Sequence, residues 1–485
     1  MKVLSVASEM FPIVKTGGLA DVVGSLPGAM APLGVETRTV LPGYPSVLKR
    51  CKRAKQIAEL NQVIGETVTL LEAKVDGLAI LIVRHPSLFE RDSGPYTDQH
   101  GTDYADNWRR FAVFSKAVAM IATGAIPGYR PDIVHCHDWQ AAMVLTYLRY
   151  GDTPAPPGVL TIHNIAFQGQ FAAQVFGELD LPASAWSLEG VEYYGGVGFL
   201  KAGLQMADAI TTVSPTYAKE IRSHEFGMGL EGLIKTRAGA VSGIVNGIDT
   251  EIWNPGTDPA LAANFDARKL KNRSANREAV CARLGLRTDN GLLIAVITRL
   301  TWQKGMDLVA EAVDGIVASG ASLAILGSGD RGLEDAFRGA AERHPGRVAI
   351  EIGYDEKLAH LMQGGCDAIL IPSRFEPCGL TQLCGLHYGC VPIVGHTGGL
   401  ADTVIDGNLA AMAAGVATGF HIAPLSAGTI VEAVELAGAA HADKAAWKKL
   451  VKNGMATDVS WNASASRYLD LYRSLVAGNG AASGT

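Results

Sequence analysis

Features that would indicate several other classes of protein are missing from this sequence. No uninterrupted apolar stretch is long enough to cross a bilayer, and the opening residues MKVLSVASEMFP are too short and polar for a signal peptide. The net charge of −6 argues against a chain held to nucleic acid by a general positive field. We therefore expect a cytoplasmic enzyme that has neither a membrane nor a nucleic acid as its partner. The sequence leaves its oligomeric state open.

Motifs for a bound metal are also missing. The chain has 7 cysteines but no C-x-x-C pair, and it has no D-x-D pair that would hold a divalent ion beside a diphosphate. Four of the cysteines lie close together, without a matching histidine cluster: Cys366, Cys378, Cys384 and Cys390. We expect buried, reduced thiols and no metal or other cofactor.

What the sequence does contain is a series of short β-branched runs that alternate with longer helix-like segments. With 485 residues, 48% of them hydrophobic, the chain is too long for one core. Runs that are apolar on both faces predict parallel strands covered by helices. The predicted strands form two series: residues 3–8, 37–42, 79–85, 132–137, 158–164 and 209–214, then residues 292–299, 322–328, 348–353, 368–373 and 391–396.

A break between the two series marks the expected domain linker. Residues 241–265 contain the turn signals NG, NPG and TDP and little periodicity. We predict an α/β protein with two Rossmann-like, doubly wound domains, residues 1–245 and 246–456. Residues 457–485 are expected to form a final helix that packs back on the first domain, and then a mobile tail, AGNGAASGT. If the two sheets face each other, the loops at the carboxyl ends of their strands line one deep cleft.

The stretch KTGGLADVVGSLP follows the first predicted strand. Its two glycines let a ligand approach the backbone, a helix start favours an anion, and Lys15 adds a full charge, so the stretch suits a phosphate. A plain tight turn with a surface lysine is the alternative. The same six residues, TGGLAD, recur behind His396 in the second series, where we expect a similar turn.

Two strand ends of the second series carry matching chemistry. Arg299 and Lys304 flank a strand-to-helix turn and could neutralise a diphosphate, although solvated surface cations are the alternative. Glu376 precedes Pro377 and a helix start, where its carboxylate could accept sugar hydroxyls or only stabilise the helix. Backbone N–H groups there could bind a phosphate, namely those of Cys378, Gly379, Leu380 and Thr381.

Two strand ends of the first series are polar, HCHDWQ and TIHNIAFQG. His135, His137 and Asp138 look like metal ligands, but neighbouring side chains on a strand point to opposite faces, so we do not expect them to converge. Asp138 and His163 could instead hydrogen-bond a polar substrate, unless His163 is a structural histidine. Residues 94–111 add aromatic and polar side chains, Tyr96 among them, a mixture that suits carbohydrate.

One motif indicates a different function. LGSGDRG contains G-x-G-x-x-G after a predicted strand, and Glu351 follows at about the spacing of a dinucleotide-binding fold, as in a nicotinamide dehydrogenase. Glu351, however, lies inside a predicted strand and not at its end. A dehydrogenase would also leave the charged residues at the other strand ends unexplained.

Taken together, these phrases resemble the bacterial glycogen synthases and plant starch synthases over nearly the whole chain. The resemblance depends on KTGGLADVVGSLP, GPYTDQHGTDYADN, HCHDWQ, TIHNIAFQG, VNGIDTEIWNP, TRLTWQKG and PSRFEPCGLTQL, in that order. It implies a two-domain GT-B fold with a deep interdomain cleft. It also implies transfer of glucose from ADP-glucose to the non-reducing end of an α-1,4-glucan, with retention of configuration.

The resemblance implies roles for the residues at the strand ends. Lys15 and Gly18 match the donor-binding loop, Arg299 and Lys304 match diphosphate-binding cations, and Tyr96 matches an aromatic residue on the glucan side. Residues matched to positions around the transferred glucose are Asp138, His163 and Asn246. The sugar- and phosphate-binding loop is matched by Glu376, Cys378, Gly379, Leu380 and Thr381. The nucleoside side is matched by Gly353 and Tyr354. The residues expected to take part in catalysis are His163, Asp138, Glu376, Arg299 and Lys304.

The sequence departs from the wider group at one position. Many retaining GT-B transferases carry a second glutamate eight residues after the first, and Cys384 stands there instead, which puts a carboxylate on the ribose in doubt. Thr298 replaces an expected serine. For retention we favour front-face attack, with double displacement on Asp138 as the alternative. Related nucleotide-sugar transferases, phosphorylases and non-catalytic glycan-binding proteins are the other functions left open.

Overall fold

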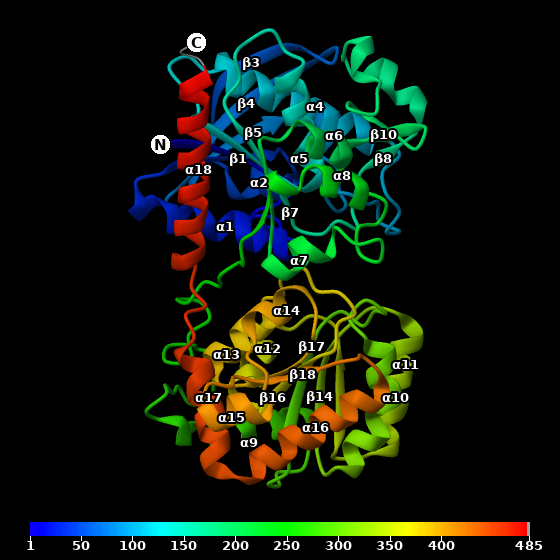
Figure 1. Ribbon diagram of the computed structural model, residues 1–485, viewed down its shortest axis with the longest axis vertical. Helices are drawn as coiled ribbons and strands as arrows, with labels where there is room; N and C mark the ends of the chain where they lie inside the picture. The colour runs from blue at the N-terminus through cyan, green and yellow to red at the C-terminus, as the bar shows by residue number, and fades with distance from the viewer. Residues whose placement is uncertain (483–485) are drawn as a thin grey trace. The chain divides into compact units, whose positions relative to one another are not determined.

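The computed structural model describes residues 1–482 and divides into two compact units (Figure 1). The first unit comprises Met1–Val213, Ala218–Asn246 and the chain from Trp461 onward, and the second comprises Ser214–Tyr217 and Gly247–Ser460. Each unit contains its own large, mostly parallel sheet, so the expected pair of α/β domains is confirmed. No helix within residues 1–482 is long and apolar enough to span a membrane.

The large sheet of the first unit has 9 strands. In spatial order they are β12 (Val241–Gly243), β11 (Ala209–Thr212), β7 (Gly158–Ile162), β6 (Ile133–His137), β1 (Lys2–Val6), β2 (Glu36–Pro42), β5 (Leu78–Arg84), β4 (Glu66–Val75) and β3 (Lys55–Val63). The strands pair in parallel from β12 to β5, whereas β4 pairs antiparallel with β5 and with β3.

Among residues 1–482, the first unit contains eight α-helices, and a ninth, α7 (Pro215–Glu220), crosses the boundary between the units. The eight are α1 (Gly18–Met30), α2 (Pro45–Arg50), α3 (Pro86–Phe89), α4 (Asn107–Met120), α5 (Asp138–Arg149), α6 (Phe199–Met206), α8 (Glu231–Thr236) and α18 (Asn462–Ala482).

The antiparallel edge of this sheet was not predicted from the sequence. Strand β3 is mostly exposed or half-buried along its length, and β4 alternates in burial. Neither therefore forms the unbroken apolar run that identified the buried parallel strands. A separate antiparallel sheet was also missed, because its strands are only two or three residues long: β8 (Gln170–Phe171), β10 (Gly196–Gly198) and β9 (Glu192–Tyr193).

The sheet of the second unit has 6 strands, all parallel. In spatial order they are β15 (Val348–Ile352), β14 (Ser322–Gly327), β13 (Leu293–Ile297), β16 (Ala368–Ile371), β17 (Val391–Gly395) and β18 (Phe420–Ile422). Alternate residues of β13 enter two different hydrophobic clusters, Ile294 and Val296 in one, Leu293 and Ala295 in the other. The sheet is therefore buried on both faces, as the sequence predicted.

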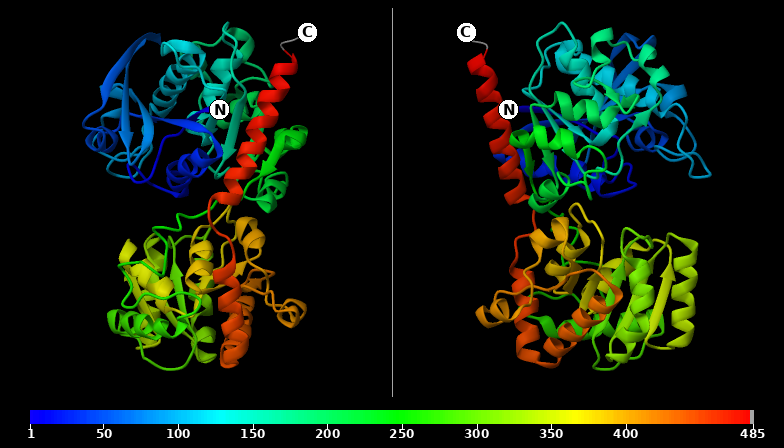
Figure 2. Two further views of the ribbon diagram at one scale, coloured as in Figure 1. Left: turned by 90° about the vertical axis from the view of Figure 1, so that its left-hand side faces the viewer. Right: turned by 45° about the vertical axis from the view of Figure 1, so that its right-hand side comes forward.

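Helices cover both faces of this second sheet (Figure 2). One face is packed by α10 (Met306–Ala318), α11 (Arg331–Arg343), α16 (Ala427–Ala442) and α17 (Lys444–Ala456). The other is packed by α9 (Arg273–Leu284) and α12 (Glu356–Gly365). Three shorter helices, all within the described residues, complete the unit. Helix α13 (Thr381–Tyr388) follows β16, α14 (Gly398–Thr403) follows β17, and α15 (Leu409–Ala414) lies between α14 and β18.

The last helix, α18, returns to the first unit and lies beside α1 (Figures 1 and 2). Tyr468 and Tyr472 are buried in one cluster with Val22 and Leu26 of α1. The helix extends through Ala482 and so includes residues 477–482 of the stretch predicted as a tail. The rest of that tail, residues 483–485, lies outside the described residues.

Candidate active site

The order of strands marks one position in each sheet where a ligand is expected. In an open α/β sheet, ligands bind beyond the carboxyl ends of the strands at the switch point, where the chain reverses its direction of travel across the sheet. That point lies between β13 and β16 in the second unit and between β1 and β6 in the first. The loops after these strands contain most of the residues expected to bind the donor.

In the second unit, the switch point brings Lys304 and Glu376 together. Lys304 Nζ donates a 2.5 Å hydrogen bond to Glu376 Oε2, which also accepts one of 2.9 Å from Ser373 Oγ. Glu376 is buried, and no other described residue bonds its second oxygen, Oε1. Arg299 is exposed in the neighbouring loop and forms no ion pair with any described residue. The carboxylate thus has one oxygen held by the protein and one left for a substrate hydroxyl.

The start of α13 adds backbone donors beside this pair. Gly379 has φ of +73°, and a Cβ there would come within 2.3 Å of Gln382 Oε1, so only glycine fits. Gln382 Nε2 donates to the carbonyl oxygens of Cys378 and Gly379 at 3.0 and 2.8 Å, which fixes the loop. The first N–H groups of a helix have no acceptor within the helix, so those of Leu380 and Thr381 can bind an anion.

The second TGGLAD copy packs against this same loop. Gly398 has φ of +46°, and a Cβ on it would lie 1.9 Å from Glu376 O; a Cβ on Gly399 would lie 2.1 Å from Cys378 O. Gly399 N donates to Glu376 O at 3.1 Å. These two glycines are therefore required for the close approach that holds the Glu376 segment in place.

In the first unit, the loop after β1 carries Lys15. Its Nζ forms a 2.7 Å ion pair with Asp21 in the first turn of α1 and lies 5.4 Å from the centre of the Phe11 ring. Gly17 and Gly18 are exposed, and a Cβ on either would meet nothing within 4 Å. The predicted turn and helix start are confirmed, and the backbone of both glycines is open to a ligand.

Asp138 and His163 lie at the ends of neighbouring strands, and a hydrogen bond joins them. Asp138, with φ of +57°, begins α5 and accepts a 2.7 Å hydrogen bond from His163 N. Burial raises the pKa of the Asp138 carboxyl to about 7, an effect that backbone N–H groups of His163 and Asn164 oppose. Burial also lowers the pKa of His163 to about 3, so its imidazole is neutral at pH 7.

The expectation that His135 and His137 do not converge was wrong for this pair. Residues two apart on a strand share a face, and the two rings lie 4.2 Å apart between centroids. His137 Nδ1 lies 3.0 Å from His163 Nε2, and His135 Nδ1 lies 2.7 Å from the Tyr472 hydroxyl on α18. A row of buried imidazoles therefore connects α18 to His163. No group of three or more His, Cys, Asp or Glu side chains within residues 1–482 is arranged to hold a metal ion.

The remaining predicted residues lie in different surroundings. Asn246 is buried, and its Oδ1 has no hydrogen-bond partner among the described residues. Tyr354 is 82% exposed and follows Gly353, which has φ of +132°, after β15. Tyr96 is half-buried, and its hydroxyl bonds Ser8 and Glu9 within the first unit.

The dinucleotide-type motif has a structural explanation. A Cβ on Gly327 would lie 1.9 Å from Thr298 O, and one on Gly329 would lie 2.3 Å from Leu300 O, so these glycines admit the loop after β13. Glu351 lies within β15 and pairs with Arg283 at 3.3 Å. The carboxylate that would bind a ribose is thus engaged elsewhere, which argues against a dehydrogenase.

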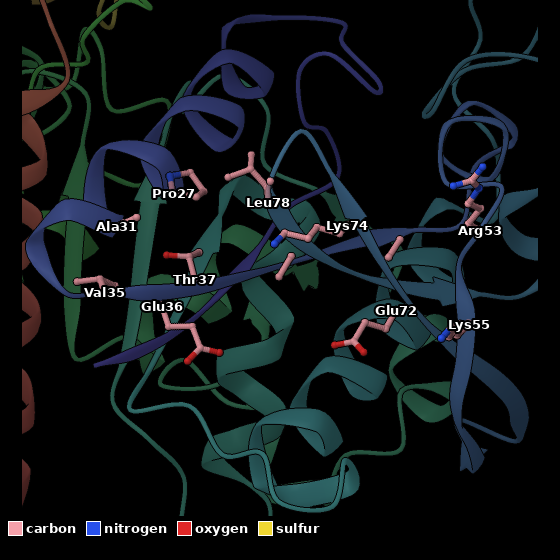
Figure 3. A pocket seen from close by; sticks show the side chains of 13 residues that line it. Pro27, Ala31, Val35, Glu36, Thr37, Arg53, Lys55, Glu72, Lys74 and Leu78 are labelled. Carbon is pink, nitrogen blue, oxygen red and sulfur yellow. The ribbon is translucent and has the colours of Figure 1, made fainter.

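A hollow of about 540 Å³ lies at the opposite end of the first sheet (Figure 3). Glu36 and Leu78 line it, and they begin the parallel strands β2 and β5. Lys74 points into it from β4 (Figure 3). Because it lies at the amino ends of these strands, it is separate from the switch point.

Three residues at the two switch points were missed by the sequence analysis. They are Glu9 and Ser373, each close after the end of a strand, and His137 at the end of β6 as the partner of His163. The position of a polar residue just after an apolar strand was the available signal for the first two.

Comparisons with known proteins agree with this geometry. A model of the starch synthase catalytic domain matches residues 2–236, and one of glycosyl transferases group 1 matches residues 284–453. A glycogen synthase from Mesorhizobium japonicum is 59% identical over 98% of this chain and 99% of its own length. The chain belongs to the glycogen synthase family. It is therefore a glucosyltransferase.

Solved structures extend the family comparison to the fold. The catalytic domain of starch synthase IV from Arabidopsis thaliana, bound to ADP and acarbose, matches with a TM-score of 0.85 and 32% identity, covering 98% of this chain and 99% of that one. Sucrose-phosphate synthase from Thermosynechococcus elongatus matches with a TM-score of 0.60 and 16% identity, covering 98% and 99%. The two α/β domains are thus those of a GT-B glycosyltransferase.

Proposed function

We propose that this glycogen synthase family member transfers glucose from ADP-glucose to the non-reducing end of an α-1,4-glucan, with retention of configuration and release of ADP. In the second unit, we assign binding of the diphosphate and the sugar to Arg299, Lys304 and Glu376. In the first unit, we assign a role in donor binding to Lys15.

The observation that carries this proposal is the Lys304–Glu376 pair at the switch point of the second sheet. Lys304 supplies positive charge, Arg299 lies exposed in the same loop, and the start of α13 supplies N–H groups. A departing ADP gains negative charge on its distal phosphate as the glycosidic bond breaks. Fixed cations and N–H dipoles stabilise that charge in the transition state. We therefore expect the reaction to need no metal ion or other cofactor.

The surroundings of Asp138 support front-face attack over double displacement. Its carboxylate accepts N–H groups of His163 and Asn164, and its pKa of about 7 leaves it partly protonated near neutral pH, so only part of the population carries the free carboxylate that double displacement needs. In the front-face reaction, the C1–O bond to the phosphate breaks and the acceptor hydroxyl attacks C1 from the same side. The acceptor proton passes to the departing phosphate oxygen. We assign the hydroxyls of the glucose to His163, which is neutral at pH 7, and to Asn246, whose buried Oδ1 has no partner among the described residues.

Release of ADP measures the proposed reaction directly. With ADP-glucose as the donor, release should depend on added glycogen, and UDP-glucose should support a slower reaction. Arg299→Ala and Lys304→Ala should each lower kcat by about 100- to 1,000-fold, because the charge that they meet grows in the transition state. Lys74→Ala, at the separate hollow, is the matched control and should keep full activity.

Three results would contradict the proposal. Unchanged kcat in both the Arg299 and Lys304 variants would remove their assignment. ADP release without glycogen would indicate a hydrolase. A glucosyl-enzyme trapped in a slow variant would replace front-face attack by double displacement.

A further inference from the structure

The loop after β1 contains a buried carboxylate with a specific set of partners. Glu9 is 3% exposed, and its carboxylate accepts hydrogen bonds from the backbone N–H and the hydroxyl of Thr16, the latter at 2.6 Å. The Tyr96 hydroxyl donates a third bond to it at 2.5 Å. Because Tyr96 gives its only proton to Glu9, the 2.6 Å contact with Ser8 Oγ is one in which Ser8 donates.

No cation within residues 1–482 forms an ion pair with Glu9. A carboxylate withdrawn from water lowers stability unless hydrogen bonds replace the lost hydration, and here neutral donors alone replace it. Two of its three bonds go to Thr16, which stands between Lys15 and the exposed Gly17–Gly18 pair. These two bonds therefore restrain the backbone one residue from the lysine, whose own side chain pairs with Asp21.

Restraint matters at this position because Thr16 is followed by two glycines, whose backbone can adopt many conformations. Gly17 and Gly18 have no side chains, and open space surrounds both. A loop that samples many conformations would place Lys15 correctly for only part of the time, and misplacing a charged group by about 1 Å can cost 100-fold in rate. Two bonds from one carboxylate to Thr16 select one conformation before the substrate arrives.

We propose that Glu9 is a positioning residue that acts on Lys15 through Thr16, with Tyr96 as the second support of the same carboxylate. The proposal rests on the proposed function, in which Lys15 binds the donor. It also gives Tyr96 a role different from the one expected from the sequence. Its hydroxyl is bonded inside the first unit, where it steadies the donor loop.

A double-mutant cycle tests this coupling. Glu9→Gln keeps the size of the side chain but replaces one accepting oxygen by an N–H₂ donor, so it cannot accept all three bonds. In the otherwise unaltered chain it should lower kcat/KM for ADP-glucose by about 10- to 100-fold. In a Lys15→Ala background the same change should cost less than about twofold, since the group that it positions is gone. Thr16→Val should behave like Glu9→Gln, and Thr16→Ser should keep activity.

Asp258 in the second unit offers a matched control. It is also 3% exposed, and it accepts bonds from the Tyr388 hydroxyl at 2.6 Å and from His360 Nδ1 at 2.7 Å. Asp258→Asn should lower the melting temperature as much as Glu9→Gln does, yet change kcat/KM by the same small factor with and without Lys15. If Glu9→Gln does not fold, Tyr96→Phe replaces it in the cycle, because it removes the hydroxyl that donates to Glu9 and accepts from Ser8 but leaves both bonds from Thr16 to Glu9.

The outcomes separate this proposal from the function on which it rests. Equal losses from Glu9→Gln in the two backgrounds, with an active unaltered chain, would overturn the positioning role alone. An unaltered chain that releases no ADP from ADP-glucose and glycogen would overturn the proposed function itself. Strong coupling to Lys15 together with full activity of Thr16→Ser supports both.

Discussion

The residues TGGLAD begin a helix in each unit, at Thr16–Asp21 and at Thr397–Asp402, and the two copies use their glycines differently. In the first copy α1 begins at the second glycine, and both glycines are exposed with open space around them. In the second copy α14 begins at the first glycine, and both glycines are buried against the backbone of residues 376–378. Identical sequence thus gives similar helix starts but opposite surroundings.

This difference separates two reasons for a glycine pair. In the second copy, internal packing requires it, because a side chain would collide with the segment that carries Glu376. In the first copy, no contact among the described residues of the unit requires a glycine pair, so the open backbone beside Lys15 is available to a ligand. The residue in front of each copy and the aspartate at its end provide ways to test this distinction.

The largest difference is expected between the residues that precede the two copies. Lys15→Ala should lower kcat by about 100- to 1,000-fold, since it removes a charge near the developing phosphate. His396→Ala should change kcat by less than about twofold, because His396 is exposed and its ring packs on His421. Steady-state rates of ADP release measure both, and similar losses would show that the copies act alike.

The second largest difference is expected between glycine variants of the two copies, measured as their stability. Gly398→Ala places a methyl group 1.9 Å from Glu376 O at positive φ, and it should lower the free energy of unfolding by about 2–3 kcal/mol. Gly18→Ala meets open space and should change it by less than about 0.5 kcal/mol. Denaturant titration compares the two, and equal stability of both variants would contradict the packing argument.

Carboxylates at the two switch points should differ in how their contribution to stability depends on pH. The folded pKa of Asp138, about 7, lies above the ordinary value of 3.8, so the folded chain binds more protons between these values and stability falls as pH rises. As the pH is raised from 5 to 8, the free energy of unfolding of Asp138→Asn should therefore rise by about 2 kcal/mol relative to that of the parent.

Asp307 in α10 is the matching case. Hydrogen bonds from Arg374 lower the pKa of Asp307 in the folded chain. The ionised carboxylate therefore contributes to stability at any pH above the ordinary pKa of an aspartate, and this contribution is lost only as the pH falls through the lower, folded pKa. The stability difference between Asp307→Asn and the parent should stay constant between pH 5 and pH 8. A difference that changes with pH in the same direction as for Asp138→Asn would contradict the assigned causes.

The smallest difference concerns the last residue of each copy. Asp402 accepts bonds from Thr216 N and Oγ1 at 2.8 and 2.7 Å, at the start of α7, so Asp402→Asn should cost about 1 kcal/mol of stability. Asp21 pairs with half-exposed Lys15, so Asp21→Asn should cost less than about 0.5 kcal/mol. Thermal unfolding at matched pH checks this, and a larger loss for Asp21→Asn would reverse the comparison.

Much of the fold could be predicted because the parallel strands are buried on both faces. An unbroken apolar run such as that of β6 or β14 identifies a strand without knowledge of its neighbours. The ends of such runs also predicted the loops at the carboxyl ends of the strands, which is how Arg299, Lys304 and Glu376 were found. The edge strand β3 was missed because its exposed face interrupts the apolar pattern.

The network around each site residue could not be predicted in the same way. Glu9 and Tyr96 are 87 residues apart in the sequence, and His135 and Tyr472 are 337 apart, so no local spacing relates them. A buried carboxylate at the end of a strand also has no sequence pattern that distinguishes it from an exposed one. For these residues, only the folded chain shows which donors satisfy which acceptors.

The return of α18 has a consequence for synthesis on the ribosome. Residues from Trp461 onward emerge after the second unit, yet Tyr468 and Tyr472 pack in one core with Val22 and Leu26 of α1. The apolar surface of α1 therefore stays uncovered while the whole second unit is translated. A nascent chain stalled before Trp461 would therefore be vulnerable to proteases and aggregation in its first unit.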